Sequence, residues 1–169
     1  MSSDDRFLPG SAVIKPGTTP ARNRAGARHA QYLKSQVETA SPTQLILMLY
    51  DGANRFCSMA LDAMEQKDYQ GQNTALQRAQ QILSHLITSL NLEKGGDIAV
   101  NLQHLYFYLY EQLVFANLND KPEIVREVQG HLIKLREGWA EVDKSARMGT
   151  LSNDELKSKL IQDGSDAKH

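Results

Sequence analysis

The sequence predicts an all-α protein, an antiparallel up-down bundle of four long helices. No proline occurs between Pro42 and Pro122, and apolar residues in that stretch recur every three or four positions, the helical period. No segment alternates apolar and polar residues over the length of a strand. Hydrophobic residues make up 41% and charged residues 23% of the 169 residues, which is typical of a chain that forms one globular core.

Capping and turn residues predict where the helices begin and end. Ser41 is followed by Pro42 and, three residues on, by Gln44, which is the pattern of a capping box at a helix start. Glycine-containing turns follow the first and second helices, and Pro122 begins the last. Because these turns are short, neighbouring helices must run antiparallel. The predicted helices cover about residues 42–66, 72–92, 98–117 and 122–145.

The two ends of the chain differ from this middle part. Residues 1–28 contain three prolines and several arginines without an apolar period, so we expect a disordered basic arm. The bundle domain then covers residues 29–145, and residues 146–169 form a flexible tail. Within that tail, a short helix beginning at Ser152 and the absence of regular structure both fit the sequence.

Charge and composition exclude several classes of function. Residues 41–145 carry nine Lys/Arg against thirteen Asp/Glu, and such an acidic body argues against a nucleic-acid surface. No stretch approaches the roughly 18 uninterrupted apolar residues of a membrane span. The N-terminus lacks the pattern of a secretory signal, and Cys57 is a single thiol. We therefore expect a cytosolic protein without nucleic-acid binding or membrane insertion.

The faces of the helices predict a core and a surplus of apolar surface. The helix at 98–117 has one stripe that suffices for the core, and a second stripe on its opposite side. Either this helix is the most central one, or its second stripe is covered by another helix, the arm, a second subunit or a partner. The second stripe consists of Val100, Phe107, Val114 and Leu118. The core stripe expected for residues 42–66 is Leu45, Met48, Leu49, Gly52, Phe56, Met59, Ala60 and Ala63.

The sequence shows no catalytic or metal-binding pattern. It has no Glu-x-x-His, no Cys-x-x-Cys and no phosphate-binding loop, so we expect no cofactor, no metal site and no enzyme. A helical Cys57 is most simply a small hydrophobic residue. His85, expected to be exposed, leaves open a histidine phosphotransfer module, but Leu86 and Ile87 follow where such modules place other residues. A structural homodimer through the second stripe is the other alternative.

Several segments of the chain carry a recognisable family pattern. The segment TASPTQLILMLYDGA at residues 39–53 is similar to the signature of the FliS family of flagellin-specific export chaperones. Tyr32 and Val37 occupy the family's positions upstream of it. The resemblance continues at residues 89–96, 116–120 and 135–139, and covers about residues 30–146. The arm before Tyr32 is longer than is usual in the family.

The resemblance implies a helical bundle that binds the C-terminal segment of flagellin in the cytosol. Such a chaperone prevents premature polymerisation and assists delivery to the flagellar type III export apparatus. It implies also that the segment around Tyr32 is a lid over part of the binding groove. The second stripe would supply one wall of this groove, with Ile82 and Ile133 as flanking candidates. The oligomeric state stays open.

Overall fold

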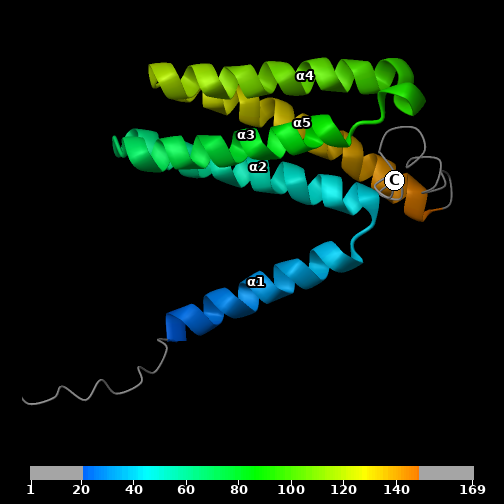
Figure 1. Cartoon of the computed structure of the whole chain (residues 1–169), viewed down its shortest axis with the longest axis horizontal. Helices are drawn as coiled ribbons and strands as arrows, with labels where there is room; N and C mark the ends of the chain where they lie inside the picture. Colours follow the sequence, from blue (N-terminus) through cyan, green and yellow to red (C-terminus); the bar gives the residue numbers. More distant parts are fainter. Residues whose placement is uncertain (1–20, 149–169) are drawn as a thin grey trace, which may run out of the picture. The chain divides into compact units, whose positions relative to one another are not determined.

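The computed structural model describes residues 21–148, which form five α-helices and no β-strand (Figure 1). The all-α class predicted from the sequence is confirmed. The chain divides after Thr39 into two compact units, of which one contains α1 and the other contains the remaining helices, called here the helical body. The helices are α1 (Ala21–Thr39), α2 (Pro42–Glu65), α3 (Tyr69–Ser89), α4 (Leu92–Asn119) and α5 (Pro122–Arg147).

Helix α1 was not predicted, because its first eight residues were assigned to a disordered arm and no helix was expected before Pro42. Its sequence is rich in alanine and arginine, both strong helix formers, and it directly follows Pro20. Nearly all of its described side chains are exposed, so its helicity rests on intrinsic propensity. Such a helix has no apolar period by which it could be recognised in the sequence. Residues 1–20 of the arm and 149–169 of the tail lie outside the described residues.

Side-chain caps begin three of the four helices of the body, α2, α3 and α4, whereas α5 begins at Pro122 without one. At the start of α2, the Gln44 backbone N–H donates to Ser41 Oγ at 3.2 Å, and the Ser41 N–H donates to Gln44 Oε1 at 3.0 Å. The predicted capping box is therefore present. At the start of α4, the Lys94 N–H donates to Asn91 Oδ1 at 3.0 Å. The turn expected at residues 93–97 becomes a kink inside α4, because Gly96 has φ 55° and ψ −139°.

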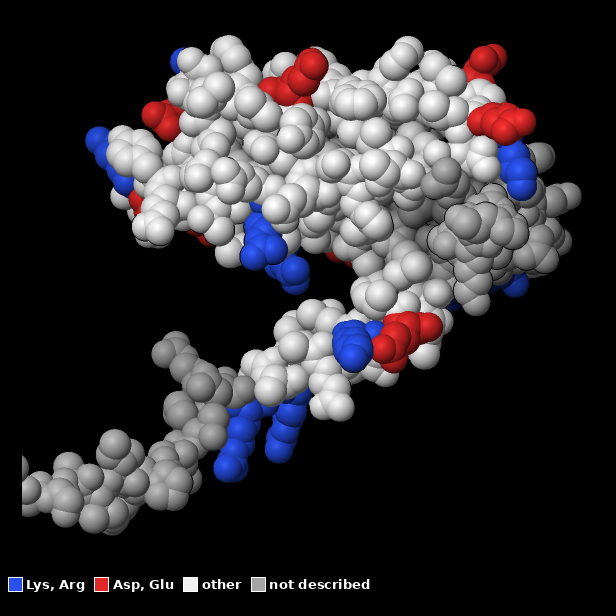
Figure 2. Space-filling model, viewed as in Figure 1, with Lys and Arg blue, Asp and Glu red and all other residues white. Residues whose placement is uncertain are grey.

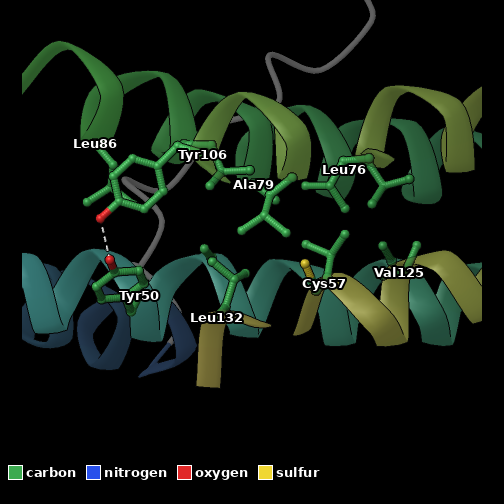
Figure 3. Close-up of a cluster of buried hydrophobic side chains, with 14 of the residues drawn as sticks. Tyr50, Cys57, Leu76, Ala79, Leu86, Tyr106, Val125 and Leu132 are labelled. Carbon is green, nitrogen blue, oxygen red and sulfur yellow. Dashed lines mark hydrogen bonds between the residues drawn. The ribbon is translucent and has the colours of Figure 1, made fainter. Parts of the chain in front are cut away.

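The four helices of the body surround one core. Helix α2 packs against α3 and α5, and α4 packs against the same two helices (Figure 1). Leucines of α3, α4 and α5 fill the centre together with small residues of α2 (Figure 3). Among the fully buried core residues are Ala53, Cys57, Ala60, Leu76, Leu83, Leu86, Leu109, Leu113 and Leu132.

The core face of α2 differs from the expected stripe by about one residue. Met59, expected in the core, is 51% exposed, whereas Tyr50 and Cys57 are completely buried. The first half of α2 is apolar on nearly all sides, so its period does not fix which side faces inward. The side of α2 that faces inward is set by the helices α3 and α5, which contact α2 on both flanks.

Gly52 lies on the side of α2 that faces α3. A Cβ added at Gly52 would lie 3.2 Å from Ile82 Cδ1 of α3, which is tighter than ordinary van der Waals contact. The close approach of α2 and α3 at this point therefore depends on the absence of a side chain. Gly138 in α5 is an exposed helical glycine where an added Cβ would meet nothing within 4 Å.

We predict that Gly52→Leu lowers the free energy of unfolding by about 1–3 kcal/mol, because the side chain overpacks the α2–α3 contact. Gly138→Leu is the matched control and should raise the free energy of unfolding by up to about 1 kcal/mol, because leucine favours the helix. Urea denaturation of both variants measures the difference. Equal effects at the two positions would contradict the close packing at Gly52.

Two tyrosines meet across the core from α2 and α4. The hydroxyl groups of Tyr50 and Tyr106 form a short hydrogen bond, and their ring centroids lie 6.4 Å apart (Figure 3). Both residues are at most 1% exposed. Burial raises the pKa of Tyr50 and of Tyr106 above the ordinary range, so both hydroxyls stay protonated and the hydrogen bond is retained at neutral pH.

We predict that Tyr50→Phe and Tyr106→Phe each lower the free energy of unfolding by about 1–3 kcal/mol. Each substitution leaves the hydroxyl of the other tyrosine buried without this partner. The double variant should cost clearly less than the two single variants together. A double-mutant cycle by urea denaturation gives the coupling. Strict additivity would mean that the two hydroxyls contribute independently.

Candidate functional site

The second apolar stripe predicted from the sequence lies on the outer side of α4. Val100, Phe107 and Leu118 are 36%, 48% and 78% exposed, and Val114 is partly exposed. At about 100° per residue, these side chains lie nearly opposite the buried residues of α4. Those buried residues are Ala99, Tyr106, Leu109, Leu113 and Ala116. The stripe is therefore exposed on the side of α4 that faces away from the core.

Aromatic side chains widen this surface toward α5. Tyr108 and Phe115 are 42% and 49% exposed. The ring of Tyr108 meets the ring of His131 of α5 edge-on, with centroids 6.4 Å apart. Uncharged residues cover most of the surface over α4, at the top of the body in Figure 2.

Two polar residues on the same side of α4 were missed by the sequence analysis. His104 and Glu111 are exposed and lie between the apolar residues of the stripe. When these two residues are included, successive positions of the stripe are four and three residues apart in alternation. This alternation is visible in the sequence and could have identified both residues. We call this set the outer face of α4: Val100, His104, Phe107, Glu111, Val114 and Leu118, flanked by Tyr108 and Phe115.

Ile82 and Ile133, the flanking candidates, lie elsewhere. Ile82 of α3 points toward α2, where its Cδ1 approaches Gly52. Ile133 is 48% exposed on α5, one turn from Gln129 and Arg136. Gln129 Nε2 donates to the Asn54 carbonyl oxygen of α2 at 3.1 Å, and Arg136 forms an ion pair with Asp51 of α2.

Both isoleucines thus belong to the sides of α3 and α5 that face α2. The structure does not bring them to the outer face of α4. The sequence could not reveal this, because assigning a residue to one flank of a helix requires knowing which neighbour lies there.

Tyr32, the candidate lid residue, lies on α1. Its side chain is 61% exposed, and Gln36 Nε2 donates a hydrogen bond of 3.0 Å to its hydroxyl oxygen. Val37 is also exposed, and Leu33 partly so. Helix α1 therefore carries apolar side chains that no core of its own unit buries.

The titratable residues of the described part form no reactive cluster. No group of three or more His, Cys, Asp or Glu side chains that could hold a metal ion occurs within residues 21–148. Burial raises the pKa of the Cys57 thiol to about 12, so this sulfur is an unreactive core atom at neutral pH. His85 is an exposed residue of α3.

A hollow of about 590 Å³ lies near the α2–α3 turn and the start of α5. Its charged lining mixes three carboxylates with the cations Lys67 and Arg126, so no single charge sign dominates. No helix between Ala21 and Met148 has both the length and the apolar character needed to cross a bilayer.

Comparison with known proteins relates this chain to one described family. Residues 24–146 match the family described as "Flagellar protein FliS". The flagellar secretion chaperone FliS of Salmonella typhimurium is 40% identical over 115 residues, which are 68% of this chain and 85% of that protein.

Other relatives with the same description support this relationship. The Bacillus subtilis protein is 32% identical over 119 residues, covering 70% of this chain and 88% of its own. The Campylobacter jejuni protein is 36% identical over 111 residues, which are 66% of this chain and 87% of that protein. The matched region begins in α1 and ends in α5, so it includes the outer face of α4. The chain belongs to the FliS family of flagellar secretion chaperones.

Proposed function

We propose that this chain binds the C-terminal segment of flagellin in the cytosol, prevents its premature polymerisation and assists its delivery to the flagellar type III export apparatus. The observation that carries the proposal is the exposed apolar outer face of α4 in a member of a flagellar chaperone family. In this proposal the protein acts by binding alone, without a cofactor and without catalysis.

The physical basis is the burial of two apolar surfaces against each other. A segment that forms amphipathic helices on binding can place its apolar side on the outer face of α4. The exposed rings of Phe107 and Phe115 are the side chains with most apolar area to bury there. The acidic body contributes to the association rate and to the choice of partner.

Two structural expectations belong to the same proposal. We infer that α2–α5 form an antiparallel up-down bundle, supported by the short connections between helices that pack as neighbours. A homodimer is the main alternative use of the outer face, because a second copy offers the same apolar surface. A phosphotransfer role for His85 rests on its exposure alone.

Substituting Phe107 tests the proposed surface. We predict that Phe107→Glu weakens binding of a flagellin C-terminal peptide by about 2–4 kcal/mol, because the complex would bury an unpaired carboxylate. The fold should persist, since the side chain is half exposed. Isothermal titration calorimetry gives the affinity, and circular dichroism gives the helicity.

Met59→Glu is the matched control, because Met59 is 51% exposed on α2, away from the outer face of α4. It should leave the affinity nearly unchanged. Loss of helicity in Phe107→Glu would assign Phe107 to the core. Undiminished binding by a folded Phe107→Glu would exclude the outer face as the flagellin site. Sedimentation of the free chain shows whether it is a monomer or a homodimer.

We further propose that the segment around Tyr32 is a reversible lid that competes with flagellin for the apolar surface. A lid lowers the apparent affinity by the fraction of molecules that are open. Tyr32 and Val37 support this role, because both are exposed apolar side chains on a helix of the separate N-terminal unit.

Deletion of residues 1–36 should therefore tighten or accelerate binding of the flagellin peptide. The Ser41 cap of α2 is retained in this variant, so the helical body should keep its melting temperature. Tyr32→Ala in the full chain should give a smaller change in the same direction. A truncated chain that is less stable and binds no better would show that the segment is a permanent part of the fold.

A further inference from the structure

The outer face of α4 has the spacing of a coiled-coil seam. Val100, Phe107 and Val114 repeat every seven residues, as do His104, Glu111 and Leu118 between them. The first set holds the d positions of a heptad and the second set the a positions. The seam spans about 27 Å at 1.5 Å per residue, which is enough for one partner helix of about five turns.

Glu111 is the only carboxylate in this seam. No other Asp, Glu, Lys or Arg occurs between Ile98 and Asn119. In the described part of the chain, Glu111 has neither an ion pair nor a side-chain hydrogen bond. The ion pairs that do occur there join Arg136 with Asp51 and Arg147 with Asp143, away from the seam.

Apolar side chains surround Glu111 on its helix. The positions three and four residues before and after it are its neighbours on the helix surface. They hold Phe107, Tyr108, Val114 and Phe115, of which three are exposed and Val114 partly so. A helix that covers these four side chains also covers the carboxylate between them. Removing a carboxylate from water is costly unless a cation of the partner meets it.

We propose that Glu111 is a specificity-determining residue: the outer face of α4 accepts a single amphipathic helix that places a lysine or arginine against this carboxylate. A polar residue at an a position is known to fix the register of paired helices, and Glu111 has that position. This inference rests on the proposed function, because it takes the flagellin C-terminal segment as the source of the helix.

Charge substitutions at Glu111 test the inference in the full chain. Glu111→Lys should weaken binding of the flagellin C-terminal peptide about 10- to 100-fold, because like charges then face each other. Glu111→Gln should weaken it less, and should reduce the dependence of the dissociation constant on salt. Glu137→Lys on α5 is the matched control, with an exposed glutamate and the same change of net charge, and should bind as the unchanged chain does.

A charge reversal in the peptide gives the decisive result. Each lysine and arginine of the peptide is changed singly to glutamate, and each variant is titrated against Glu111→Lys. One reversal should restore most of the lost affinity, and that position identifies the residue that faces Glu111.

Three outcomes would overturn the inference. If the unchanged chain does not bind the peptide, the proposed function fails and this inference fails with it. If the unchanged chain binds but Glu111→Lys binds equally well, the proposed function is retained, and Glu111 contributes only to the solubility of the surface. If Glu111→Lys binds weakly but no reversal restores affinity, the carboxylate has no single cationic partner.

Discussion

The hydrogen bond between Tyr50 and Tyr106 joins α2 to α4 across the core and favours the orientation of α4 in which Phe107 faces outward. Both hydroxyls are buried, and each provides the other with a hydrogen-bond partner across the core. Turning α4 by one residue would bury Phe107 in place of Tyr106 and leave Tyr50 without that partner. With Tyr106 inside, the apolar stripe through Phe107 lies on the outer side, so this polar contact and the buried leucines of α4 together leave the candidate site exposed.

Polar contacts between the helices also hold the two ends of the body. At one end, Thr43 Oγ1 of α2 donates to Asp143 Oδ1 of α5 at 2.6 Å. At the other end, Gln72 Nε2 of α3 donates to Asp120 Oδ1, directly after α4, at 2.8 Å. Gln72 and Asp143 are almost fully buried, so misplacing either helix would leave a buried polar group unpaired. These contacts define the register of the helices, while the outer face of α4 takes no part in them.

The sequence predicted the helical class, the capping box at Ser41 and the exposed stripe of α4, because these depend on local patterns. It did not predict helix α1, whose alanines and arginines carry no apolar period. It also misplaced the core face of α2, where Met59 is exposed and Tyr50 buried. The positions of Ile82 and Ile133 depend on which neighbour lies beside α3 and α5, and only the packed structure contains that information.

Site-specific photo-crosslinking tests directly whether flagellin binds at the outer face of α4. A photoreactive phenylalanine derivative replaces Phe107 in one variant and Tyr69, a somewhat more exposed aromatic residue at the start of α3, in another. We expect a crosslink to flagellin from position 107, little from position 69, and none when flagellin lacks its C-terminal segment. Crosslinking from position 69 alone, or from position 107 only to a second copy of the chain, would contradict it.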